Sequence, residues 1–146
     1  DAFHQTASSP EGKGNYLAMT GALKMSGLST ADIDYINLHG TGTINNDLSE
    51  GTAIQRVFGN NIPKVSSTKP YTGHTLGACA GVEAVYAILT MEEGFIPPNL
   101  RLTTPMKELS FVPVTELIEG VELKHVMSNS FGFGGNCSSV IFSKVN

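Results

Sequence analysis

Residues 33–43 are IDYINLHGTGT, and they predict a β-strand that runs directly into a glycine-bearing turn. Residues 33–38 alternate apolar and polar side chains, which is the pattern of a half-buried strand. His39 follows that strand, at the place where an α/β sheet usually has its ligand crevice. Gly40 and Gly42 permit backbone conformations that other residues resist, so the imidazole can be directed into the crevice.

Helical and strand patterns alternate on both sides of this segment. We expect a helix over 15–25, a helix capped within 45–47 and ending near 58, a strand over 64–68, a helix over 76–92, an extended surface segment over 94–114, and strands over 124–129 and 137–144. This order predicts an α/β fold with a mostly parallel sheet and an antiparallel final pair. The helix over 76–92 combines a small-residue side with an apolar side, which predicts that it is buried nearly all round.

The composition indicates one globular domain that does not bind nucleic acid or membranes. The chain has 146 residues, a net charge of −4 and a pI near 5.5, which disfavour polyanionic partners. No apolar run approaches the roughly 20 residues of a membrane span. The sequence starts without Met and without a secretion-signal pattern, and two cysteines do not make a disulfide framework. We therefore expect a cytoplasmic chain that was processed or cut from a longer protein.

A second histidine, His74, lies in a similar turn five residues after Lys69. A lysine this close in a loop would keep an imidazole neutral by like-charge repulsion. A neutral imidazole still donates one N–H, so two of them at one sheet edge could donate to a single carbonyl oxygen. Taken singly, each histidine is explained as well by a satisfied turn residue, and the lysine by a solvated loop.

Three carboxylates accompany these residues. Asp47 and Glu50 are three residues apart on one face of the second expected helix, although helix capping alone also explains Asp47. Glu83 lies in a small and apolar helix, where a carboxylate needs a partner. The candidate partners are Lys69, a backbone amide or a bound cation, and such a carboxylate can hold a loop without doing chemistry.

Other site chemistries fit the sequence less well. The two turn histidines lack the close spacing of a zinc pair, so a zinc hydrolase is a minor alternative. The glycine-rich turn at 132–135 precedes a strand, whereas phosphate-binding loops open a helix; it suits a movable flap carrying Phe131 and Phe133. Cys137 has no base nearby in sequence, and Cys79 lies on the small-residue face of the expected buried helix, where burial would raise its pKa.

Three motifs together closely resemble the C-terminal half of β-ketoacyl-acyl-carrier-protein synthases, the KAS I/II-like condensing enzymes of the thiolase superfamily. They are HGTGT at 39–43 with Asp47 and Glu50, SSTKP at 66–70 with Gly73-His74 and Gly77-Ala78, and NSFGFGG at 129–135. The resemblance implies that residues 1–146 form a thiolase-like α/β half-domain, a mostly parallel mixed sheet with helices packed on it. The N-terminal half of that family, with its cysteine nucleophile, has no counterpart here.

The resemblance also implies roles for individual residues. These are His39, His74 and Lys69 as catalytic residues, Asp47, Glu50 and Glu83 as supporting acids, Thr41 and Thr43 on the phosphopantetheine arm, and Phe131 and Phe133 in the gating loop, with Phe133 the stronger gate candidate. The implied reaction is decarboxylative Claisen condensation of an acyl thioester with malonyl-acyl carrier protein, in fatty acid, polyene or polyketide synthesis. It needs no cofactor and no metal.

The implied partners are acyl carrier protein, the chain's own N-terminal half, and a second subunit in a homodimer or heterodimer. The alternative is a non-catalytic partner akin to a chain-length factor, which would need neither histidine. Three residues depart from the family pattern: Asn136-Cys137 replaces the usual Thr-Asn, and Cys79 replaces a common Ala. Without the cysteine nucleophile, we expect this chain alone to be inactive in condensation.

Overall fold

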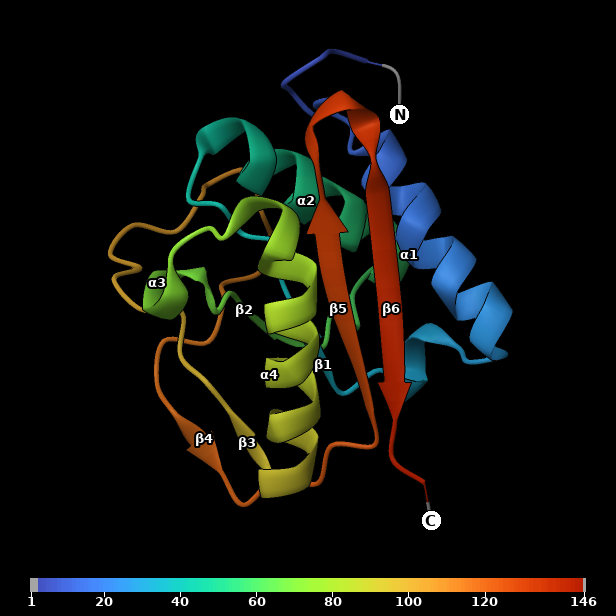
Figure 1. Cartoon of the computed structure of the whole chain (residues 1–146), viewed down its shortest axis with the longest axis vertical. Helices are drawn as coiled ribbons and strands as arrows, with labels where there is room; N and C mark the ends of the chain where they lie inside the picture. Colours follow the sequence, from blue (N-terminus) through green and yellow to red (C-terminus); the bar gives the residue numbers. More distant parts are fainter. Residues whose placement is uncertain (1–2, 146) are drawn as a thin grey trace.

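The computed structural model describes residues 3–145 and shows a four-stranded sheet with helices on both faces (Figure 1). The main elements are α1 (Lys13–Ser26), β1 (Tyr35–Asn37), α2 (Ile44–Phe58), β2 (Lys64–Ser66), α3 (Lys69–Thr72), α4 (Cys79–Glu93), β3 (Phe95–Ile96), β4 (Ile118–Glu119), β5 (His125–Phe131) and β6 (Cys137–Ser143). Single 3₁₀ turns lie at Thr30–Asp32, Leu76–Ala78 and Phe133–Gly135.

The four-stranded sheet has the order β2-β1-β5-β6. β1 pairs in parallel with β2 on one side and with β5 on the other, and β5 pairs antiparallel with β6. The predicted mostly parallel sheet with an antiparallel last pair is therefore confirmed. β3 and β4 form a short antiparallel pair. β3 lies within the segment 94–114 that is expected to be extended, and β4 lies beyond its end.

Alternate residues of β1 supply the two cores. Ile36 faces α1 and α2, where it packs in a cluster with Met19, Ile54 and Met127. Tyr35 faces α4, in a second cluster with Ala87 and Val126. Because strand side chains alternate between faces, a strand of only three residues anchors helices on both sides of the sheet.

Two predictions about the helices need correction. The N-cap of α2 is Thr43, whose hydroxyl accepts from the Asn46 N–H, rather than a residue within 45–47. The helix predicted to be buried all round is instead exposed along one face, with Val85 57%, Ile88 40% and Leu89 39% accessible. Its apolar periodicity was real, but only the side carrying Glu83 and Ala87 packs on the sheet. Among the described residues, no helix is long and apolar enough to cross a bilayer.

Candidate active site

Three loops meet at one edge of the sheet because three parallel strands end there. The turn with His39 follows β1, the segment with Lys69 and His74 follows β2, and Phe131 is the last residue of β5. The ring centroids of His39 and His74 are 5.3 Å apart with planes at 84°. The centroid of the Phe131 ring is 6.0 Å from that of His39. The predicted convergence of the two histidines is confirmed.

The hydrogen bonds define the same tautomer for both imidazoles. Lys69 Nζ lies 3.2 Å from His39 Nδ1, and an ammonium group only donates, so Nδ1 accepts. His74 Nδ1 accepts the Leu76 N–H at 3.3 Å. In each neutral ring the proton therefore resides on Nε2, and the site has two Nε2–H donors.

Burial keeps these rings neutral. It is the largest cause lowering the pKa of His39 to about 3, with smaller contributions from the nearby Lys69 and His74. The pKa of His74, a more exposed residue, is also lowered, first by burial and then by Lys69. The expected repulsion by Lys69 is present for both rings, although its direct contact is with His39 rather than His74.

A buried ion pair holds Lys69 in place. Its ammonium group contacts Glu83 Oε1, and the two side chains are 5% and 2% exposed. The lysine is thus the partner that Glu83 was expected to need. Burial raises the pKa of Glu83, and the bond and charge of Lys69 oppose that rise. Glu83 Oε2 has no partner, so the pair depends on a single carboxylate oxygen.

Glu50 holds the His39 turn through its two oxygens. They accept the backbone N–H groups of His39 and Gly40, both at 2.9 Å. Asn129 Nδ2 donates to the same carboxylate at 3.2 Å, and Ser139 Oγ donates to Asn129 Oδ1 at 2.7 Å. Burial raises the pKa of Glu50 to about 7 against these three bonds. Glu50 is therefore a positioning residue, and the role of Asn129 was not foreseen although it stands in a quoted motif.

The other predicted residues lie around this centre. Asp47 is in the first turn of α2, bonded to Asn46 Nδ2 at 3.1 Å, and burial raises its pKa. The Thr41 and Thr43 hydroxyls are 2.9 Å apart. Phe133 is 72% exposed in the glycine-rich turn, whereas Phe131 is buried. Phe131 lies beside His39 and Thr41 is at the site, whereas Thr43 is exposed at the N-cap of α2 and Phe133 is on the surface.

The two cysteines differ in their surroundings. Cys79 is buried at the start of α4, and burial raises its pKa as expected. Unexpectedly, its sulfur lies within 4.8 Å of ligand atoms of His39 and Glu83. Cys137 opens β6, its thiol donates to Asn15 Oδ1 at 3.4 Å, and burial raises its pKa. Raised pKa values disfavour the thiolate, so neither cysteine is activated.

A metal ion does not fit the grouping of His39, Cys79 and Glu83. These are the ligating side chains that come together within the described residues, and Lys69 Nζ already contacts both His39 Nδ1 and Glu83 Oε1. A cationic side chain in the ligand set would repel a metal cation. His74, Asp47 and Glu50 are not part of this group, so the zinc alternative gains no support from the geometry.

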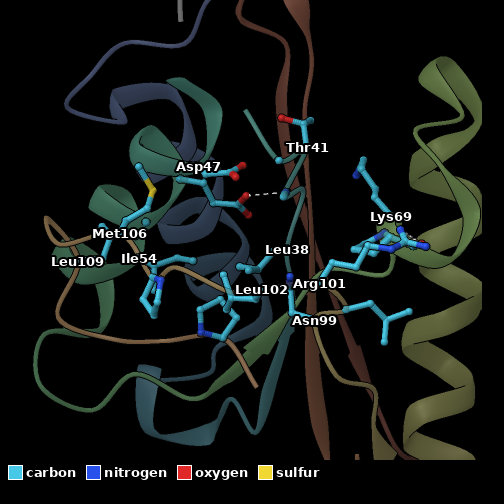
Figure 2. Close-up of a pocket in the computed structure, with 18 of the residues that line it drawn as sticks. Leu38, Thr41, Asp47, Ile54, Lys69, Asn99, Arg101, Leu102, Met106 and Leu109 are labelled. Carbon is cyan, nitrogen blue, oxygen red and sulfur yellow. Dashed lines mark hydrogen bonds between the residues drawn. The ribbon is translucent and has the colours of Figure 1, made fainter. Parts of the chain in front are cut away.

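A cavity of about 560 Å³ opens beside the two turns. Lys69, His74 and Thr41 line one part of it, and the rest is formed by α2 and by residues 99–113. Figure 2 shows Lys69 and Arg101 on one side of this cavity and Asp47, Ile54, Met106 and Leu109 on the other. The site thus combines a polar, donor-bearing end with a largely apolar interior.

The fold is that of the ketosynthases among solved structures. One solved structure contains a type II PKS acyl-carrier protein in complex with its ketosynthase bound to the hexaketide. A chain of that structure superposes on this one with a TM-score of 0.92 at 29% identity, over 100% of this chain and 36% of that chain. A chain of the ketosynthase in complex with its chain length factor from Xenorhabdus doucetiae gives 0.85 at 41% identity, over 99% and 37%.

Sequence comparison identifies the family. The family model described as "Beta-ketoacyl synthase, C-terminal domain" matches residues 1–103, and the chain belongs to this family. The chain is 40% identical over 146 residues to 3-oxoacyl-[acyl-carrier-protein] synthase 2 of Staphylococcus aureus strain COL, covering 99% of this chain and 35% of the relative. It therefore spans about a third of the length of the curated relatives it matches.

Proposed function

We propose that this chain is the enolate-stabilising C-terminal domain of a 3-oxoacyl-[acyl-carrier-protein] synthase. The observation that carries the proposal is the pair of Nε2–H donors on His39 and His74, held neutral with ring centroids 5.3 Å apart. Two fixed donors at one point are what a developing oxyanion requires. The family membership is the independent support for this class of reaction.

The proposed reaction is a decarboxylative Claisen condensation. Malonyl-acyl carrier protein loses carbon dioxide, and the electron pair of the broken bond forms an enolate whose oxygen accepts from His39 and His74. The enolate carbon then attacks the carbonyl carbon of an acyl group held as a thioester, and the thiolate leaves. We assign that thiolate to a cysteine in the part of the protein outside this chain, because Cys79 and Cys137 are not activated.

The remaining residues support this chemistry. Lys69 and Glu83 fix the His39 tautomer, and Glu50 with Asn129 fixes the turn that carries the ring. Thr41 and Thr43 are proposed to contact the phosphopantetheine arm, with Asp47 close to them, and Phe131 and Phe133 to line the entrance. The proposal includes acyl carrier protein and a second subunit as partners, a cytoplasmic location, and no resident cofactor or metal.

The alternative, a non-catalytic chain-length-factor-like subunit, would not need this geometry. Nothing in such a role calls for two neutral imidazoles with matched tautomers or for a buried lysine that sets one of them. We therefore give it second place.

Single histidine variants of the full-length protein test the proposal. Replacing His39 or His74 with Phe keeps a ring and removes both nitrogens, and each change should lower kcat for condensation by about 10²–10³-fold. Acylation of the protein by a labelled acyl thioester should persist, because the nucleophile lies elsewhere. His4→Gln is the matched control, since His4 is exposed and, among residues 3–145, its ring bonds to Thr6.

Two results would count against the assignment. Condensation at the wild-type rate in both Phe variants would remove the histidines from the mechanism. Labelling of Cys79 or Cys137 when this chain alone meets the thioester would show that the nucleophile lies within it.

A further inference from the structure

We propose that the cavity between α2 and residues 99–113 binds a free medium-chain carboxylate, with its head on Arg101 and its alkyl tail in the apolar interior. This inference goes beyond the proposed function, because it concerns a ligand that is not turned over. It rests on the shape and chemistry of the cavity, which is within the roughly 300–1,000 Å³ range of small-molecule sites.

The interior of the cavity is built for an apolar tail. The apolar side chains that line it include Leu38, Ile54, Leu102, Met106, Leu109 and Phe111. Leu109 lies directly against α2 at Gly51, where a Cβ would collide with the leucine methyl groups. The cavity is therefore walled at this end by the close approach of α2 and residues 99–113, and a linear tail entering from the other side is enclosed.

The mouth offers a cation without an anionic partner. Arg101 adopts a left-handed backbone conformation, φ +63°, which is unfavourable for residues other than glycine. Its Nη1 donates to the Pro70 carbonyl at 3.3 Å, beside Lys69. Within residues 3–145 the ion pairs are Lys69 with Glu83 and Lys124 with Glu122, so Arg101 has no carboxylate of its own. A guanidinium presents donors in a fork that matches a carboxylate.

The charge distribution fixes the orientation of the ligand. Arg101 and Lys69 lie on one side of the cavity, and Asp47 lies on the other with the apolar residues of α2 (Figure 2). A carboxylate is attracted to the first side and repelled from the second. The ligand is therefore expected to bind with its carboxylate on Arg101 and its alkyl tail toward Ile54 and Leu109.

Occupancy would also close the histidine site. His74, Lys69 and Pro70 line the same cavity as the apolar residues. A carboxylate on Arg101 would thus lie in front of His74 and exclude another ligand from its Nε2–H. The predicted consequence is that free medium-chain carboxylates compete with whatever binds at the two histidines.

Titration of the chain with hexanoate, octanoate, decanoate and dodecanoate tests this proposal. Calorimetry should show Kd falling about fourfold per added methylene until the cavity is filled, since each buried methylene contributes a constant increment. The His74 ring resonances should shift on binding. These measurements need no turnover, so they stand whether or not the condensation proposal is correct.

Two variants separate head recognition from tail burial. Arg101→Gln should raise Kd at least about tenfold, because a bond to a charged group is lost. The matched control is Arg56→Gln, since Arg56 lies over the Tyr16 ring at 4.4 Å and outside the cavity lining. Met106→Glu should weaken binding while Arg101 is intact. Equal Kd values for dodecanoate and dodecylamine, no dependence on chain length, or equal effects of the two arginine variants would overturn the proposal.

Discussion

Replacing Glu83 with Gln is expected to destabilise the chain by about 3 kcal/mol, near the lower end of the range for breaking a buried ion pair. The two side chains are 5% and 2% exposed, so water cannot compensate for the lost charge. Glutamine retains an oxygen that accepts from Lys69, but the ammonium loses the attraction, worth about 4 kcal/mol at 4 Å in an environment of intermediate dielectric. Lys69 would remain buried with only neutral acceptors, one of them His39 Nδ1.

The companion variant Lys69→Met should cost about as much, roughly 3–5 kcal/mol, because it leaves a buried carboxylate unpaired. Glu83 Oε2 already lacks a partner, so no other bond would replace the lysine. The double variant Lys69→Met with Glu83→Leu removes both charges and fills the space. It should be more stable than either single variant, since apolar replacement of a buried pair is often neutral.

The single variant Glu83→Leu closes a double-mutant cycle with the wild type, Lys69→Met and the double variant, and urea unfolding of these four proteins gives the coupling free energy of the pair. The control is Glu122→Gln, which breaks an exposed pair with Lys124 at 3.6 Å and should cost at most about 1 kcal/mol. Salt should weaken the exposed pair and leave the buried pair almost unchanged. Single-variant costs that simply add in the double variant, or equal costs for Glu83→Gln and Glu122→Gln, would refute the reasoning.

Three further predictions concern the titration of His39 and Glu50, the bond from Asn129 to Glu50, and the packing of α1 on α2. The pKa of His39, about 3, lies below the usual 6.5, so the stability that His39 contributes is lost as pH falls from 6.5 toward 3. The pKa of Glu50, about 7, lies above the usual 4.5, so the stability that Glu50 contributes is lost as pH rises from 4.5 toward 7. These two changes in the free energy of unfolding, each about 1.4 kcal/mol per pH unit, oppose one another between pH 4.5 and 6.5. Relative to wild type, His39→Phe should therefore lose stability as pH rises, and Glu50→Gln should lose stability as pH falls. Urea midpoints measured across this pH range test both expectations. Asn129→Leu should cost about 1–3 kcal/mol by removing a buried donor to Glu50, and the exposed Asn136→Ala serves as its control. Gly12→Ala should be strongly destabilising in thermal melts, because φ is +60° and a Cβ would meet the Ser49 carbonyl, while Gly21→Ala in open space should gain up to about 1 kcal/mol.

The site was predictable where it depends on strand ends. Residues that follow parallel strands must emerge at one edge, so His39 and His74 could be brought together from the sequence alone. Lys69 was one of three candidate partners for Glu83, because a carboxylate in an apolar helix needs a partner, and the structure selects it. Both inferences use local pattern and a general energetic rule, and neither requires knowledge of long-range packing.

Other features depend on contacts that periodicity does not encode. The exposure of Val85 on α4 depends on which neighbours are present, and an apolar pattern alone does not say whether they belong to the same chain. The place of Cys79 beside His39 follows from how α4 docks on the sheet. The cavity is closed by the irregular residues 99–113, whose path is set by single contacts such as that of Asn99 with Ser67.

The carboxylate of Glu50 has a consequence for the order of folding. Its partners lie 11, 10 and 79 residues away along the chain, at His39, Gly40 and Asn129. The first two contacts are local, whereas the contact with Asn129 forms only after the chain has closed a long loop, which makes it slow. We therefore expect the bond from Asn129, which ties β5 to the His39 turn, to form late in folding.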